Sequence, residues 1–273
     1  MKSVALGQFY PADSALHRLD PRMKVVLTVL YIISSFLCKN VFSFALLLAS
    51  SIVLILCGRI PVKIVLRGLR PVLLILAFTA ILNIFWTKGE RALVDWYFIE
   101  IYAEGLYTAA FIMIRISTLI VGTSMFLTYT TTPIALTDAL EDLLSPLKKL
   151  RVPVHEFAMM MTIALRFIPL LMEETDKIMT AQKARGADFS SGSLIQRAKA
   201  LIPILIPLFI SAFNRAGDLA TAMECRCYHG GEGRTRMHVR HVRAVDFIPL
   251  VLMLLFGAAL IVLNIYGIGY TMP

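Results

Sequence analysis

The chain has 273 residues, of which 58% are hydrophobic and only 16% are charged. These proportions exclude an ordinary soluble domain and indicate an integral membrane protein. The formal net charge is +9 at pH 7. Basic residues retained on one side of a membrane and attraction to anionic lipid headgroups explain this charge, so we expect the lipid bilayer as a partner and no nucleic acid.

The first 24 residues carry several charged side chains. They contain neither an apolar core nor a small-residue cleavage site, so we expect no cleaved signal peptide. Residues 1–24 are therefore predicted to form a cytoplasmic N-terminal segment.

Apolar runs long enough to cross roughly 30 Å of hydrocarbon predict five transmembrane helices. They lie near residues 25–38, 41–57, 71–87, 106–129 and 245–266. The first run is short for a crossing, and it is also compatible with one tilted half of a tight hairpin with the second. The first four spans give a membrane domain over residues 25–129, and residues 244–273 hold the last span and a short external tail.

The basic residues predict the orientation, because Lys and Arg that flank transmembrane helices are retained in the cytoplasm. With the N-terminus inside, segments 1–24, 58–70 and 130–243 are cytoplasmic, and they hold 23 of the 27 Lys and Arg. We therefore predict a cytoplasmic N-terminus. Arg115 lies inside the fourth span, where we expect a structural role and, as its partner, a helix carbonyl or a carboxylate in the coupling region.

Residues 130–243 are neither a normal loop nor plainly transmembrane, so we expect the function to reside there. A shorter helix is predicted to begin at Thr132-Pro133, an N-cap hydroxyl followed by a proline in the first turn. Two long helical patterns follow, over about 155–183 and 193–224, each mostly apolar with a narrow polar stripe. Their prolines, Pro169, Pro203 and Pro207, are expected to kink them. The first stripe consists of Thr162, Arg166, Glu173, Lys177 and Thr180, and the second of Ser211, Asn214, Arg215, Asp218 and Thr221.

The two long helices have an alternative interpretation as ordinary transmembrane helices, because residues 201–210 are almost wholly apolar. Their charged residues argue against it. These are Glu173, Glu174, Asp176, Lys177, Arg215 and Asp218. Each charge at the bilayer centre costs roughly 2.5–3.5 kcal/mol. We therefore expect the charged halves to lie at the interface or in the cytoplasm.

Two short basic signatures stand where the long helices are predicted to end. They are Ala184-Arg185-Gly186 and Cys225-Arg226-Cys227. A guanidinium stays charged and can bind a carboxylate through two parallel hydrogen bonds, so each arginine is a candidate for gripping a partner. Gly186 allows the backbone to turn out of the helix, whereas Cys227 lacks that freedom at positive φ. The alternative is a solvated basic helix end favoured by the helix dipole.

Six fragments, in order over nearly the whole chain, resemble the transmembrane (T) component of energy-coupling factor (ECF) transporters. They are Ser14-Ala15-Leu16-His17-Arg18-Leu19-Asp20-Pro21-Arg22 with Lys24, Thr131-Thr132-Pro133, Ala164-Leu165-Arg166-Phe167-Ile168-Pro169, Ala181-Gln182-Lys183-Ala184-Arg185-Gly186, Ala222-Met223-Glu224, and Cys225-Arg226-Cys227. The second signature departs from the family's usual Ala-Arg-Gly.

The resemblance implies a fold and a set of partners. The protein would be an all-α membrane subunit with about five transmembrane helices plus two long helices and one shorter helix in a coupling region, residues 130–243. It would sit in the plasma membrane of a prokaryote and join two cytoplasmic ATPases to a small membrane-embedded S component, for uptake of vitamins or related micronutrients. Arg185 and Arg226 would each enter a groove on one ATPase.

Other chemistries have little support in the sequence. Cys225, Cys227 and His229, with His238 and His241 nearby, have poor spacing for a structural zinc site. Gly230-Gly231-Glu232-Gly233-Arg234 lacks the P-loop lysine and is more typical of a flexible connector. We therefore predict no metal, no cofactor and no enzymatic activity. The alternative function is a secondary transporter that works without ATPases, although we find no internal repeat and no carboxylate inside a confident span.

Overall fold

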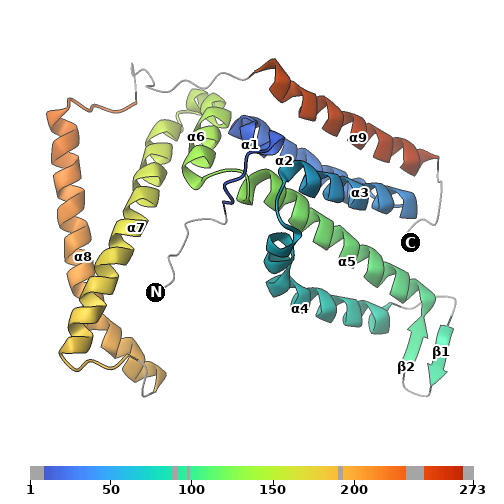
Figure 1. The fold of residues 1–273 in the computed structure, drawn as a ribbon, viewed down its shortest axis with the longest axis horizontal. Coiled ribbons are helices and arrows are strands. Elements are labelled where there is room, and N and C mark those ends of the chain that lie inside the picture. Colours follow the sequence, from blue (N-terminus) through green and yellow to red (C-terminus); the bar gives the residue numbers. More distant parts are fainter. Residues whose placement is uncertain (1–8, 88–91, 97–98, 190–192, 232–242, 267–273) are drawn as a thin grey trace. The chain divides into compact units, whose positions relative to one another are not determined.

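The computed structural model describes residues 9–87, 92–96, 99–189, 193–231 and 243–266. Nearly all of them are helical (Figure 1), and the chain divides into two compact units. One unit comprises residues 1–139 and 240–273, and the other comprises residues 140–239. The predicted all-α membrane class is confirmed, with one short pair of strands added to it.

The first unit consists mainly of α-helices, joined by a pair of strands and by short segments of other helix types. In chain order its elements are α1 (Ala15–Arg18), α2 (Pro21–Leu37), α3 (Val41–Gly58), α4 (Val62–Trp86), β1 (Ala92–Trp96), β2 (Ile99–Tyr102), α5 (Ala103–Thr123), the π-helical η1 (Ser124–Thr128), α6 (Pro133–Leu143, ending in the second unit), the 3-10 turn η3 (Ala244–Asp246) and α9 (Phe247–Ile265). The strands β1 and β2 pair antiparallel.

The core of the first unit lies where α2 packs on α5 and α9, with α3 and α4 also against α5. Its largest buried apolar side chains include Tyr31, Leu47, Phe126 and Leu260. Gly122 of α5 allows this close approach, because a Cβ there would lie 2.0 Å from Cε1 of Tyr31. Close packing of the Tyr31 ring on Gly122 therefore positions α2 against α5, in addition to the burial of apolar surface.

Lys24 links the first fragment of the family resemblance to Thr130, the residue just before the second fragment. Its side chain is only 1% exposed, and its Nζ donates to the carbonyls of Thr130 at 2.8 Å and His17 at 3.3 Å. A buried ammonium is stable only when its donors find acceptors. The N-terminal fragment thus anchors the start of α2 to the segment that follows η1.

Arg115 is paired as predicted, with a backbone carbonyl at a helix end. Its Nη2 donates to the carbonyl of Cys38 at 2.8 Å, and its guanidinium lies 5.2 Å from the ring centroid of Phe44. Nearby, Asn40 Nδ2 donates to the carbonyl of Leu263 at 3.0 Å. These contacts tie the α2–α3 connection to α5 and α9, which is a structural role.

Six helical segments of the described residues are long and apolar enough to cross a membrane. They are Val41–Gly58, Val62–Trp86, Ala103–Thr128, Val154–Ala184, Ile195–Cys225 and Ala244–Ile265. Four of them correspond to predicted spans, and the total is close to the five expected. The first predicted span, α2, has only 17 residues and is not among the six. The two long helices of the second unit are among them, so length and composition alone do not separate them from transmembrane helices.

The second unit holds the end of α6, the 3-10 helix η2 (Ser145–Leu150), α7 (Val154–Ala184) and α8 (Leu194–Cys225). Both predicted long helices are present, within a few residues of their expected bounds. The start of α6 also matches its prediction, because Thr132 Oγ1 accepts from the backbone N–H of Ala135 at 3.3 Å. Ser193 caps α8 in a capping box with Gln196.

Candidate functional site

The C-terminal end of α7 forms a Schellman turn around the first signature. Arg185 is the C-cap, and Gly186 follows it at a φ of +86°. The N–H of Gly186 donates to the carbonyl of Lys183 at 3.0 Å, and the N–H of Ala187 donates to the carbonyl of Gln182 at 3.0 Å. This pattern satisfies the last helix carbonyls and directs the chain out of the helix.

The C-terminal end of α8 forms the same turn around the second signature. Arg226 is the C-cap, and Cys227 follows it at a φ of +55°. The N–H of Cys227 donates to the carbonyl of Glu224 at 2.8 Å, and the N–H of Tyr228 donates to the carbonyl of Met223 at 3.1 Å. Cys227 thus occupies the left-handed position that glycine occupies in α7, which the residue type alone does not favour.

Both arginines are available to a partner. Every residue of the two signatures is exposed: Ala184, Arg185, Gly186, Cys225, Arg226 and Cys227. Among the residues that the structure describes, neither guanidinium has a hydrogen bond or an ion pair. Figure 1 shows that the C-terminal ends of α7 and α8 lie well apart, so the structure does not bring the signatures together. They are two separate sites of one kind, and their role in binding stays a prediction.

The left-handed conformation of Cys227 predicts that a glycine at this position stabilises the end of α8, whereas a glycine at position 225 destabilises it. Cys227→Gly removes the cost of a Cβ at positive φ, about 1 kcal/mol, so we expect the amide hydrogen of Tyr228 to exchange about fivefold more slowly. Cys225→Gly is the matched control, because it places a glycine inside the last helical turn and should destabilise it by about 0.5–1 kcal/mol. Hydrogen exchange of the two purified variants checks this. Equal effects of the two substitutions would contradict the turn at Cys227.

A salt bridge links the two long helices. Arg215 Nη2 of α8 lies 2.8 Å from Glu174 Oε2 of α7, and Arg215 Nε donates to Ser211 Oγ at 3.3 Å. Arg215 and Ser211 belong to the predicted polar stripe of α8. Their partner Glu174 is the neighbour of Glu173, which belongs to the predicted polar stripe of α7. The sequence pattern therefore predicts the correct helix for the polar contact but not the correct residue.

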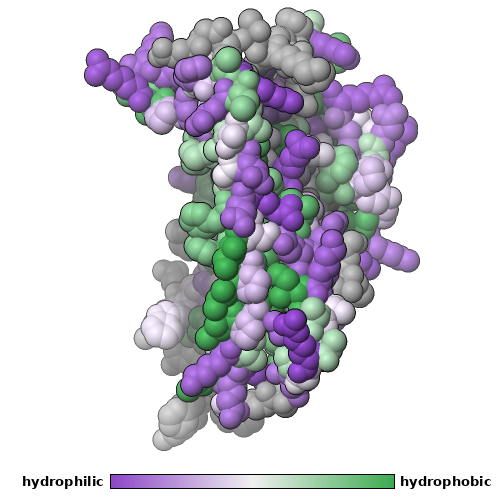
Figure 2. Space-filling model, turned by 90° about the vertical axis from the view of Figure 1, so that its left-hand side faces the viewer, coloured by the Kyte–Doolittle hydropathy of each residue, from purple (hydrophilic) through white to green (hydrophobic). Residues whose placement is uncertain are grey.

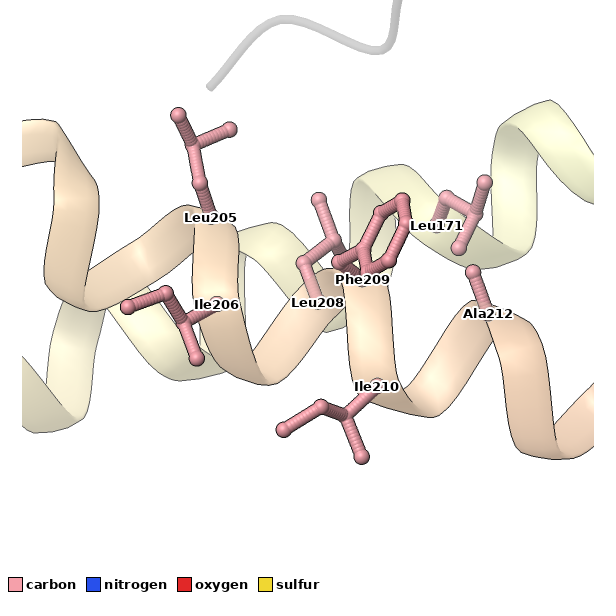
Figure 3. A pocket seen from close by; sticks show the side chains of 7 residues that line it. All are labelled: Leu171, Leu205, Ile206, Leu208, Phe209, Ile210 and Ala212. Carbon is pink, nitrogen blue, oxygen red and sulfur yellow. The ribbon is translucent and has the colours of Figure 1, made fainter.

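An apolar groove of about 510 Å³ lies beside this salt bridge, along the middle of α8. All but one of its lining residues come from α8, and Leu171 comes from α7 (Figure 3): Leu171, Leu205, Ile206, Leu208, Phe209, Ile210 and Ala212. Phe209 is 65% exposed. Figure 2, which views the molecule from the left-hand side of Figure 1, shows a strip of hydrophobic side chains flanked by hydrophilic ones. An exposed apolar surface of this kind marks contact with a membrane or a hydrophobic partner.

The potential metal ligands that the structure describes are not gathered at either signature. Among the described residues, no three His, Cys, Asp or Glu side chains are placed to hold a metal ion. Cys225 and Cys227 are free thiols, and His229 Nδ1 lies 2.9 Å from the carbonyl oxygen of Cys227. His238 and His241 lie outside the described residues. The absence of a metal or cofactor remains a prediction.

The chain is similar over most of its length to a known family. Residues 12–239 match the family model CbiQ, a cobalt transport protein. The curated protein of Ruminiclostridium cellulolyticum named energy-coupling factor transporter transmembrane protein EcfT is 53% identical over 251 residues, which are 92% of each chain. Proteins of the same name from Clostridium kluyveri and Bacillus subtilis are 51% and 46% identical, over 91% and 97% of this chain and 92% and 99% of their own.

Proposed function

This chain belongs to the family of transmembrane proteins of energy-coupling factor transporters, and from that premise we propose that it is the scaffold that couples two ATPases to a substrate-binding S component. It is a multi-pass membrane subunit of a transporter. In the proposed complex it binds no cofactor and catalyses no reaction. Its N-terminus faces the cytoplasm in a prokaryotic plasma membrane, and the cargo is a vitamin or a related micronutrient.

The observation that carries the proposal is the repeated geometry of the two signatures. Arg185 and Arg226 each stand at the C-cap of a long helix, exposed and ahead of a left-handed residue. Two sites with the same backbone geometry at separate helix ends suit two related partners, such as a pair of related ATPases. A bidentate arginine–carboxylate pair would give each contact both strength and direction.

The apolar groove supports the second half of the proposal. Phe209 and the aliphatic side chains around it form an exposed surface between helix ends that are polar. A small hydrophobic membrane protein is the kind of partner that such a surface fits. The S component would therefore rest on α7 and α8 near their salt bridge.

The proposed mechanism is mechanical. Closing of the ATPases on ATP would move the two arginine ends, and the rigid helices would transmit that movement to the groove where the S component rests. The salt bridge between Glu174 and Arg215, at 2.8 Å, would make α7 and α8 move as a pair. The S component would then tilt and release its cargo to the cytoplasm.

The first test is purification of the tagged chain from its native membrane in a mild detergent, followed by mass spectrometry of the bound proteins. We expect two ATPases with P-loop motifs and one or more small hydrophobic proteins. A chain that comes out alone in several mild detergents, and that takes up substrate in vesicles without ATPases, would instead support the secondary transporter.

A further inference from the structure

The segment after the second signature returns to the beginning of α7. The N–H of Gly231 donates to Glu156 Oε1 at 3.3 Å, across 75 residues of sequence. A Cβ on Gly231 would lie 2.5 Å from Cδ2 and 3.1 Å from Cβ of His155. Only glycine fits so close to this imidazole. The Arg226 turn is therefore held from both sides, by α8 before it and by the start of α7 after it.

The imidazole that meets Gly231 is itself fixed. His155 Nδ1 lies 3.0 Å from Glu141 Oε1, and the two side chains are 30% and 12% exposed. This contact holds the ring in place, so the ring cannot swing away without losing it. We call Glu141, His155, Glu156 and Gly231 the clasp. Although glycines at this point suggest a flexible connector, Gly231 is packed; residues 232–234 lie outside the described part of the chain.

The first signature has no equivalent of the clasp among the described residues. A Cβ on Gly186 would meet no atom of the described residues within 4 Å, so no side chain packs against Gly186 as His155 packs against Gly231. The two arginine ends share their backbone geometry but differ in support. At the Arg226 end, Gly231 packs after the turn against the start of α7. At the Arg185 end, a described contact with the other long helix comes before the turn, where Gln182 Nε2 donates to the carbonyl of Pro203 at 3.5 Å.

We propose that the clasp is a positioning element that fixes the direction in which Arg226 meets its partner. Arg226 is the anchored contact, which transmits force between one ATPase and the start of α7. This inference rests on the proposed function, because it concerns how the second arginine meets its ATPase.

The test is a set of variants of the full chain, each purified with its ATPases. Gly231→Ala adds a Cβ against His155, and we expect it to reduce ATPase retention about tenfold. In a His155→Ala background the imidazole is gone, and the same substitution should change retention less than twofold. Gly217→Ala is the matched control, because a Cβ on Gly217 meets nothing within 4 Å.

A second pair of variants reports on the clasp without the ATPases. Glu156→Ala removes the acceptor of the Gly231 N–H, and this amide should exchange about tenfold faster with solvent. Glu156→Gln keeps an oxygen acceptor, and it should restore the protection of the Gly231 amide.

The outcomes separate the clasp from the proposed function. If Arg226→Glu abolishes ATPase retention but Gly231→Ala leaves it unchanged, the clasp does not position the arginine. Equal effects of Gly231→Ala with and without the imidazole would also overturn the positioning role. If Arg226→Glu itself leaves retention unchanged, the proposed ATPase contact is wrong, whatever the clasp variants show.

Discussion

Reversing the charge of both signatures, as Arg185→Glu with Arg226→Glu, is expected to separate the chain from its ATPases while leaving it folded in the membrane. Both side chains are exposed and have no partner among the described residues, so their loss removes no contact that supports the fold. A hydrogen bond to a charged group contributes about 1.5–3 kcal/mol. The loss of both contacts, together with charge repulsion, should lower the affinity of the chain for the pair of ATPases by at least a hundredfold.

The measurement is the amount of ATPase that remains on the tagged, detergent-purified chain. Lys148→Glu with Lys149→Glu is the matched control, because both lysines are exposed in η2 and the net charge changes by the same amount. Arg185→Lys with Arg226→Lys should fall between, since lysine keeps the charge but not the planar pair of donors. If the double glutamate variant retained as much ATPase as the Lys148→Glu, Lys149→Glu control, the two signatures would not be part of the ATPase interface.

The long helices and their ends illustrate what the sequence could predict. Helical periodicity and capping residues place α7 and α8 within a few residues, because both signals are local. The sequence alone does not predict the turn at Cys227. A cysteine at positive φ is unfavourable by itself and becomes acceptable only when its surroundings stabilise that conformation. The Schellman hydrogen bonds to Met223 and Glu224 and the clasp beyond them provide that support.

The contacts that position these elements could not be predicted, because they join distant parts of the sequence. Lys24 meets Thr130 across 106 residues, and Gly231 meets Glu156 across 75. Neither pair has a periodic or a motif signal of its own. Arg115 is the exception, because a charge inside a span must find a partner, which the pattern already implies.

Gly122→Ala is the second substitution from which we expect a large effect, here on stability. The added Cβ would lie 2.0 Å from Cε1 and 2.6 Å from Cζ of Tyr31. The ring of Tyr31 cannot move aside easily, because it is 1% exposed and its hydroxyl donates to the carbonyl of Thr118 at 3.3 Å. Overpacking of this kind costs about 1–3 kcal/mol, more than alanine recovers in helix propensity.

The midpoint of thermal unfolding of the detergent-solubilised chain, followed by size-exclusion chromatography, measures this effect. Gly257→Ala is the control in α9, because its Cβ would make an ordinary contact of 3.6 Å with Ser34 Oγ. The midpoint of thermal unfolding of this variant should change as little as it does for a typical surface substitution. In a Tyr31→Leu background the penalty of Gly122→Ala should largely vanish, because the atoms that clash are gone. An unchanged penalty there would mean that α2 and α5 do not meet at Gly122, and that the membrane unit packs differently.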